Sequence, residues 1–214
     1  MSAMTTLMLD SPVQGLAATA PQSLSFAPST HVRAFVLRRE LGDLLVYAND
    51  KVDRSLMADR QYLGHWHEAM VAGRDSGLPV FVNDADRAEV ARVMPVRGGF
   101  TLRHKLASDF EVIPMPGHTP GSTAYLWDSG HHRFLFTADS LYLGGDGTWR
   151  AAVLESSDRE QYIRSLELLR ELDFDVLVPW AASADRPYVD VVERGEARRR
   201  LDEVIARLRA GQDS

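Results

Sequence analysis

The stretch "QYLGHWHEAM", residues 61–70, decides how the rest of the chain is interpreted. It carries two histidines separated by a single residue, His65 and His67. In an extended strand or loop, side chains at positions i and i+2 point to the same side, so both imidazoles can reach one metal ion. Taken alone, such a pair is better explained by two loop histidines that bond to the backbone. The interpretation therefore depends on what other residues the chain offers.

A second stretch, "PMPGHTPGS" at residues 114–122, places His118 in an unusual setting. Its three prolines and two glycines exclude a helix or a central strand. They predict a rigid turn with His118 at its tip, and a stiff loop holds a metal ligand in place at little entropic cost. The alternative is a tight turn whose histidine points to solvent.

Asp139 ends a third stretch, the apolar strand predicted from "RFLFTADS" at residues 133–140. An aspartate there can also cap a turn or a helix. Three histidines and one carboxylate from three strand ends form a set of ligands that Zn²⁺ accepts. We expect the remaining histidines elsewhere: His104, His131 and His132 at the surface, and His31 in a position the sequence does not indicate.

Composition narrows the classes of protein and of site. The chain has 214 residues, 45% apolar and 25% charged, which is typical of one soluble globular domain. It has no cysteine, so disulfides, thiolate metal sites and a cysteine nucleophile are excluded. A net charge of −6 with scattered basic residues argues against nucleic-acid binding. Apolar runs are too short for a membrane span, and no signal peptide is evident, so we expect a cytoplasmic protein.

The order of predicted elements is strands first, then a helix, then strand and helix again. Residues 1–25 have weak periodicity and are predicted to be a loosely packed lead-in, with a single domain over 26–214. Within that domain we expect a hairpin at 32–50, a strand at 80–84, a helix over 85–94 capped by Asp84, strands within 100–117, 122–128 and 132–138, a helix after a capping box at Ser157 and Glu160, a strand at 174–180, and a last helix around 201–208.

These motifs, in this order, resemble the metallo-β-lactamase superfamily over about residues 28–210. "LGHWHEAM" stands in the place of the H-x-H-x-D-H motif, "PMPGHTPGS" in that of the third-motif histidine turn, "LFTADSL" in that of the strand ending in the bridging aspartate, and "VLVPWAA" where members usually carry Pro-Gly-His. The second and third are the specific parts and look like the glyoxalase-II-like branch of hydrolases. The resemblance implies an α/β fold, an αβ/βα four-layer sandwich with its site along one edge of the two sheets.

Carried over position by position, the resemblance implies that this chain has the ligands of a first metal ion and lacks those of a second. The residues that match the ligands of the first zinc are His65, His67 and His118, and Asp139 matches the carboxylate that bridges two metals. The residues that replace the other ligands of a second zinc are Ala69, Met70 and Ala181. Glu68 stands next door, but strand alternation predicts that it points away from the site. We therefore expect one zinc ion and no ordinary binuclear centre.

The resulting functional hypothesis is a mononuclear zinc hydrolase acting on an ester, thioester or lactone of a small molecule. Three imidazoles leave an open position for water, and Asp139 can ligate the metal, orient the water or act as the base. One alternative is a catalytically inactive relative that binds a metal or small ligand. Another is an interaction protein whose histidines are relics. The sequence does not indicate the oligomeric state.

Overall fold

The computed structural model describes residues 10–212. Its strands are β1 (Asp10–Val13), β2 (Leu16–Ala18), β3 (Gln22–Leu24), β4 (Ala27–Val32), β5 (Phe35–Leu37), β6 (Leu44–Val46), β7 (Arg60–Tyr62), β8 (Val80–Asn83), β9 (Val96–Phe100), β10 (His104–Ala107), β11 (Phe110–Pro114), β12 (Thr123–Asp128), β13 (Arg133–Ala138), β14 (Tyr142–Leu143), β15 (Trp149–Arg150), β16 (Val176–Pro179), β17 (Ala181–Ser183) and β18 (Asp190–Val191). Its helices are α1 (His67–Ala72), α2 (Arg87–Val90), α3 (Arg159–Arg170) and α4 (Arg194–Arg209), with a 3-10 turn at Arg54–Leu56.

The strands form two large sheets and a smaller one. The first sheet has the order β1-β2-β5-β6-β7-β8-β9 and the second has the order β10-β11-β12-β13-β16-β18. The small sheet, β15-β14-β17-β4-β3, joins segments from both ends of the chain. Strands β6, β7, β8 and β9 pair in parallel with one another, and β13 pairs in parallel with β16. In parallel strands the carboxyl ends lie at the same edge of the sheet, where ligand sites commonly form.

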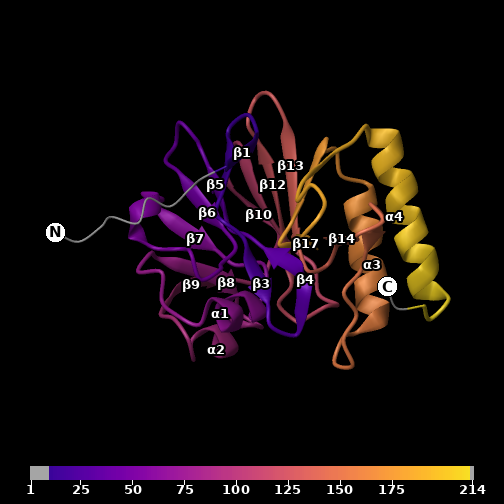
Figure 1. Cartoon of the computed structure of the whole chain (residues 1–214), viewed down its shortest axis with the longest axis horizontal. Helices are drawn as coiled ribbons and strands as arrows, with labels where there is room; N and C mark the ends of the chain where they lie inside the picture. Colours follow the sequence, from indigo (N-terminus) through magenta and orange to yellow (C-terminus); the bar gives the residue numbers. More distant parts are fainter. Residues whose placement is uncertain (1–9, 213–214) are drawn as a thin grey trace.

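Side-chain alternation explains why the second sheet is covered on both faces. In β12, Tyr125 and Trp127 point into the core between the two large sheets, whereas Ala124 and Leu126 pack in a cluster with α3 and α4. Helices α1 and α2 pack against β8 on the outer face of the first sheet. Figure 1 shows α3 and α4 side by side at the right of the molecule, and α1 and α2 next to each other at the bottom, below β8 and β9. The result is the αβ/βα four-layer sandwich that the sequence predicted.

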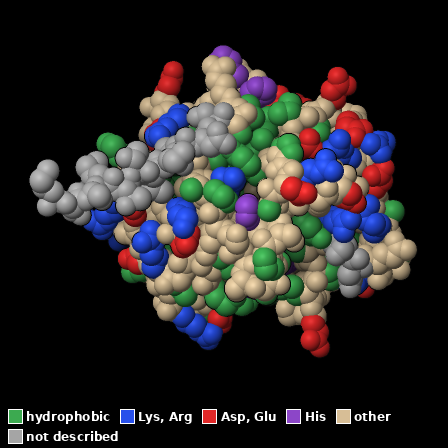
Figure 2. Space-filling view, viewed as in Figure 1, with side chains coloured by type: hydrophobic (Ala, Val, Ile, Leu, Met, Phe, Trp, Pro, Cys, Tyr) green, Lys and Arg blue, Asp and Glu red, His purple; other side chains and the backbone are tan. Residues whose placement is uncertain are grey.

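The outer helices carry charged side chains of both signs. Figure 2 shows basic and acidic groups intermingled over the end of the molecule formed by α3 and α4. There Arg199 lies 2.7 Å from Glu196, and Arg170 lies 2.7 Å from Asp202. This surface is a solvated face with paired charges. Within residues 10–212, no helix combines the length and apolar character needed to cross a membrane.

The predicted lead-in is wrong over most of its length. Residues 10–24 form β1, β2 and β3, and Leu16, Ala17 and Ala18 are buried in the core. These strands have three or four residues each, so they carry too little periodicity to be recognised from sequence. Residues 1–9 lie outside the described part of the chain, and the division into a lead-in and one domain over 26–214 is otherwise untested.

Two helix boundaries also differ from the prediction. Helix α2 covers only Arg87–Val90, and its N-cap is Asp86 rather than Asp84. Helix α3 begins one residue later than the capping box implied, since the Asp158 side chain accepts a hydrogen bond from the Gln161 amide. The predicted hairpin around Gly42 is confirmed by the antiparallel pairing of β5 with β6.

Candidate metal centre

His65 and His67 lie where the chain changes from strand to helix. Strand β7 ends at Tyr62, and α1 begins at His67. Between them, Gly64 allows a close approach of the two sheets: a Cβ there would lie 2.4 Å from the Ala138 Cβ, far inside van der Waals contact. The amide of Thr123 donates to the Gly64 carbonyl at 2.8 Å, which fastens the first sheet to the second at this edge.

His118 occupies the tip of the predicted turn between β11 and β12. The turn is closed by the Met115 amide, which donates to the Ser122 carbonyl at 2.6 Å. Gly117 has φ 151°, and a Cβ there would lie 2.4 Å from the Cα of Tyr162 in α3. The His118 Nδ1 lies 2.6 Å from the Ala152 carbonyl oxygen. Because a carbonyl only accepts, the ring must carry its hydrogen on Nδ1, and Nε2 keeps a lone pair.

Asp139 follows directly on the end of β13, as predicted. The preceding residue, Ala138, has φ 49°, an uncommon conformation for a residue with a Cβ. The Tyr162 hydroxyl lies 2.9 Å from the Asp139 carbonyl oxygen and 3.0 Å from that of Ser140, so α3 holds the backbone at this point. The unusual turn aims the Asp139 carboxylate toward the histidines instead of continuing the strand.

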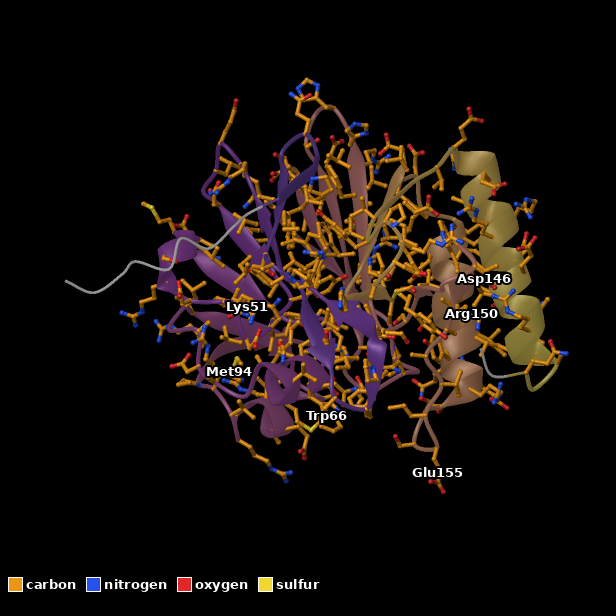
Figure 3. All side chains as sticks on the ribbon, in the orientation of Figure 1. Lys51, Trp66, Met94, Asp146, Arg150 and Glu155 are labelled. Atoms are coloured by element: carbon orange, nitrogen blue, oxygen red, sulfur yellow. The ribbon has the colours of Figure 1, made fainter. Side chains whose placement is uncertain are left out.

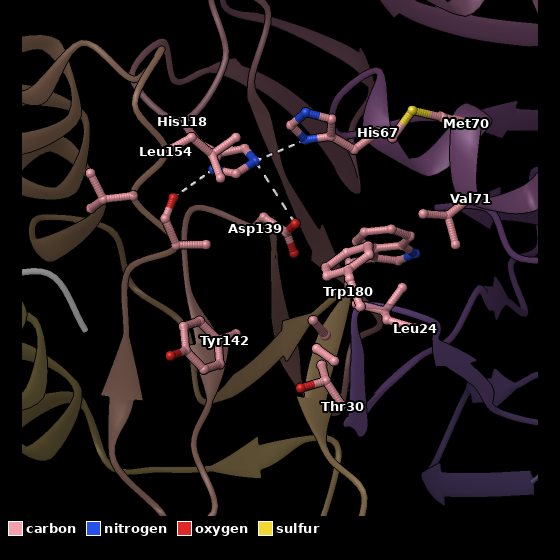
Figure 4. A pocket seen from close by; sticks show the side chains of 15 residues that line it. Leu24, Thr30, His67, Met70, Val71, His118, Asp139, Tyr142, Leu154 and Trp180 are labelled. Carbon is pink, nitrogen blue, oxygen red and sulfur yellow. Dashed lines mark hydrogen bonds and ion pairs between the residues drawn. The ribbon is translucent and has the colours of Figure 1, made fainter.

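The structure brings the four predicted site residues together. One ligand atom from each of His65, His67, His118 and Asp139 lies within 4.8 Å of the others. The His67 Nδ1 is 3.1 Å from the His118 Nε2, and an Asp139 carboxylate oxygen is 3.3 Å from the His65 Nε2 and 3.8 Å from the His118 Nε2. Figure 4 shows His67, His118 and Asp139 facing one another across a cavity.

The other histidines lie apart from this group, as expected. His104 is exposed on β10, and His131 is exposed in the turn between β12 and β13. His132 is half-buried, with its Nδ1 3.0 Å from an Asp175 carboxylate oxygen. His31, which the sequence did not place, lies on β4.

Asp86 ties the two histidine-bearing loops together. It is buried, and one of its carboxylate oxygens accepts from the Trp66 amide at 3.1 Å and the Thr119 hydroxyl at 2.7 Å. The other accepts from the Gly121 amide at 2.8 Å. A single side chain at the start of α2 therefore positions the residues next to His67 and His118. Nothing in the residues around Asp86 indicates this role, because its partners are 20 to 35 positions away.

The prediction that Glu68 points away from the site is wrong. Glu68 is fully buried, and its Oε1 lies 3.0 Å from the His65 Nδ1. The same oxygen accepts from the backbone amides of Gly64 and His65, at 2.9 and 3.1 Å. Strand alternation does not apply, because α1 has begun and a helical residue directs its side chain back along the chain. Glu68 thus fixes the orientation of the His65 ring from behind.

The surroundings of the site shift the pKa values of His65 and His67 in opposite directions. Burial, helped by the charges of His65 and His118, lowers the pKa of His67 to about 3. Burial alone would lower the pKa of His65, but its interactions with Asp139 and Glu68 outweigh burial and raise that pKa to about 10. Burial also raises the pKa of Glu68 to about 7. The two carboxylates therefore make the space around His65 favourable for a positive charge.

The donor atoms fit a divalent metal ion. The His65 Nε2 and the Asp139 Oδ1 are buried and have no hydrogen-bond partner of good geometry, a costly arrangement unless another group satisfies them. With its Nδ1 donating to Glu68, the His65 Nε2 presents a lone pair to the same space as the His118 Nε2 once a metal ion replaces the proton that the raised pKa of His65 keeps there. Lone pairs that converge from three imidazoles, beside a carboxylate, require a cation or a proton between them, and this donor set suits zinc.

The positions that the resemblance assigned to a second metal carry no ligand. Ala69 is buried among the apolar side chains of α1 and β8, and Met70 and Ala181 line the cavity. Trp180 lies between Asp139 and Val71 in Figure 4, and its ring centroid is 5.4 Å from that of His65. The Trp180 indole N–H donates to the Ala48 carbonyl at 2.8 Å. This side of the centre is thus occupied by an aromatic ring.

Comparison with known proteins assigns the family. The family model described as the metallo-beta-lactamase superfamily matches residues 43–181, which include all four clustered side chains. The chain belongs to this superfamily. Members of the superfamily generally bind metal ions, often zinc, and the clustered histidines and aspartate agree with that property.

Relatives and solved structures support the same assignment. The chain is 31% identical over 130 residues to a hydroxyacylglutathione hydrolase of Pectobacterium atrosepticum, covering 58% of this chain and 47% of the relative. It spans less than half the length of the curated relatives it matches. Its fold is similar to that of a metallo-beta-lactamase from Pontibacter korlensis, with a TM-score of 0.66, 13% identity and coverage of 95% and 99% of the two chains. It is also similar to the FIM-1 metallo-beta-lactamase from Pseudomonas aeruginosa in its mono-zinc form, with a TM-score of 0.65, 10% identity and coverage of 93% and 96%.

Proposed function

We propose that the protein is a mononuclear zinc hydrolase that cleaves esters, thioesters or lactones of small molecules. The observation that carries the proposal is the convergence of His65, His67, His118 and Asp139 within 4.8 Å, with two of their buried donor atoms unpartnered. Relatives of the chain are named hydroxyacylglutathione hydrolases, and hydrolysis of an acyl group on the glutathione sulfur cleaves a thioester, which supports this reaction class.

The proposed roles follow from the contacts of each side chain. His65, His67 and His118 would hold the metal through the Nε2, Nδ1 and Nε2 atoms that face one another. When bound, zinc would act as a Lewis acid and lower the pKa of a water molecule to roughly 7. Asp139 would orient that water and take up its proton, because its Oδ1 has no protein partner. Glu68 would keep the His65 ring in a fixed orientation and tautomer.

A single ion is proposed because the residues for a second one are missing. Ala69, Met70 and Ala181 supply no ligand to zinc, and three imidazoles leave a coordination position open for water. One similar solved structure holds its metallo-beta-lactamase in a mono-zinc form, so the fold is compatible with one ion.

A second candidate function is metal or small-ligand binding without hydrolysis. The same missing ligands favour it, because Ala69, Met70 and Ala181 supply no group that could hold a second ion. The chain would then act as a binding protein that keeps the histidine cluster.

Metal analysis of untagged protein tests the proposal first. We expect about one zinc per chain, lost in His118→Ala and retained in the matched surface variant His104→Ala. Equal metal content in the two variants would rule out the proposed ligands. Hydrolysis of an aryl ester or thioester that is abolished by a chelator and restored by zinc then distinguishes an enzyme from a binding protein. A fully loaded protein that is inactive on ester, thioester and lactone panels would contradict the hydrolase.

A further inference from the structure

The mouth of the cavity beside the histidines is lined by exposed apolar side chains. Phe26 is 76% exposed, Met70 52% and Leu154 39%, and all three line the same cavity of about 420 Å³. They come from the turn between β3 and β4, from α1 and from the segment before α3. Large apolar side chains that converge on one opening from three parts of the chain mark a binding surface, because their exposure to water is unfavourable.

The segments that carry these side chains are held in place. The Leu154 amide donates to the Ser157 hydroxyl at 3.0 Å, and that hydroxyl lies 3.1 Å from the His118 carbonyl oxygen. On the opposite side, the Gln22 side-chain amide of β3 donates to the Val71 carbonyl of α1 at 3.0 Å. The apolar mouth is therefore fixed relative to the histidines and does not depend on rearrangement.

The cavity wall is apolar as well. Figure 4 shows Leu24, Val71 and Trp180 together on one side of the cavity, across from Leu154. Because the indole N–H of Trp180 is bonded to a backbone carbonyl, the ring offers its apolar surface to a ligand. The volume of the cavity falls within the range typical of small-molecule sites.

Positive charge is missing from this lining. Its ionisable members are His67, His118, Asp139 and Tyr142, and within residues 10–212 the lining includes no lysine or arginine. Arg150 lines an adjacent hollow that shares Tyr142 and Thr30, but it pairs with Asp146 at 2.8 Å, and Figure 3 labels both beside α3 and α4. A ligand carboxylate placed in the part of the cavity away from the metal ligands would lose water without gaining a cationic partner.

We infer that the cavity takes an apolar, uncharged group, such as an alkyl or aryl acyl chain, and discriminates against anionic carriers such as glutathione. The part of the inference that concerns catalysis rests on the proposed hydrolase function, whereas the binding preference does not. Glutathione carries two carboxylates, so its thioesters would bring negative charge to a site that offers an aspartate and no basic side chain.

Binding to metal-free protein tests the cavity without catalysis. The neutral fluorophore N-phenyl-1-naphthylamine is titrated into protein treated with a chelator, and we expect saturable binding. Leu154→Lys and Phe26→Lys should each weaken it by about tenfold or more. The matched control Leu102→Lys, which alters a side chain 75% exposed outside the cavity, should leave the Kd within about twofold. Absence of binding to the wild-type protein, or equal weakening by all three variants, would overturn the inference.

Matched thioesters test the catalytic part on zinc-loaded protein. With N-acetylcysteamine as a neutral carrier, kcat/KM should rise from acetyl to octanoyl by up to about fourfold per methylene until the cavity is filled. The same acyl group on glutathione should react about tenfold more slowly or worse. A flat series, or a preference for glutathione, would overturn the inference and leave the hydrolase intact. If no thioester or ester reacts, the proposed function fails, and fluorophore binding alone decides the cavity's preference.

Discussion

The hydroxyl of Tyr47 lies 2.8 Å from the amide nitrogen of Ala138 and 2.8 Å from the carbonyl oxygen of Val178. It accepts from the first and donates to the second, and the ring is fully buried. Strands β13 and β16 run parallel up to this point, where their register shifts. Tyr47 thus satisfies the two backbone groups that the shift leaves free, and the chain can turn at Ala138 and direct Asp139 into the site.

Replacing Tyr47 with phenylalanine should therefore destabilise the fold and disturb the site together. Two buried backbone groups lose their partner, and we expect a loss of about 1–3 kcal/mol in the free energy of unfolding, measured in urea. Tyr125→Phe is the control, since it removes a single bond to the Leu63 carbonyl. Only the change at Tyr47 should also weaken zinc binding. Equal metal affinity in the two variants would mean that Tyr47 does not position Asp139.

A methyl group at Gly64 should separate the two sheets at the site. In Gly64→Ala the new Cβ would meet Ala138 at 2.4 Å and a Glu68 carboxylate oxygen at 2.9 Å. Such overpacking typically costs about 1–3 kcal/mol. Gly195→Ala in α4, where nothing lies within 4 Å, should instead stabilise the protein by up to about 1 kcal/mol. Urea unfolding of both variants measures whether the free energy of unfolding falls or rises. An unchanged value for Gly64→Ala would show that the two sheets can move apart here at little energetic cost.

Glu68→Gln should weaken metal binding more than it weakens the fold. The neutral amide can present an N–H to the His65 Nδ1, and the ring then loses the partner that keeps its Nε2 free. Outer partners of this kind typically contribute about tenfold to a hundredfold in metal affinity. Competition with a chromophoric chelator measures the affinity, and Glu155→Gln is the control, because Glu155 is exposed and projects away from the body of the molecule. Unchanged metal affinity in Glu68→Gln would mean that Glu68 does not contribute to metal binding.

Acid stability should depend on the pair formed by Arg39 and Asp109. The Arg39 guanidinium makes two hydrogen bonds of 2.7 Å to the Asp109 carboxylate and lowers its pKa. A pKa lowered by folding contributes stability above the unfolded value, about 3.9, and that contribution is lost as the pH falls through the folded value. Asp109→Asn should therefore lower Tm at pH 5 to 7, with a difference that shrinks below about pH 4.

The reciprocal variant checks the origin of that effect. Arg39→Gln breaks the same pair from the other side, so its Tm difference from the wild type should shrink over the same pH interval. A difference that stays constant down to pH 2 would mean that ionisation of Asp109 has no part in it.

The sequence was sufficient to predict features that depend only on neighbouring residues. Proline and glycine around His118 specified a turn, and the turn is present with Gly117 in a conformation that few other residues adopt. The apolar run before Asp139 specified a strand end. Each of these features depends on a few consecutive residues, and such features can be identified without knowing what lies opposite.

Residues whose role depends on distant partners were not predictable in this way. Asp86 and Tyr47 act on segments 20 to 131 positions away, and nothing in their immediate sequence indicates it. Glu68 was misplaced for a local reason. The chain changes from strand to helix between Gly64 and His67, so strand alternation no longer predicts the direction of the Glu68 side chain. The sequence does favour a short helix from His67 to Gly73, and helical geometry rather than strand alternation places Glu68 within reach of His65.

The four clustered side chains come from both large sheets: His65 and His67 follow β7 of the first, whereas His118 and Asp139 belong to loops at the end of the second. An ion held among them would act as a cross-link between the two halves of the sandwich at this edge. Any slippage of one half over the other would change the spacing of the nitrogens. The affinity for the ion would then report how well the interior is packed, even for substitutions far from this edge.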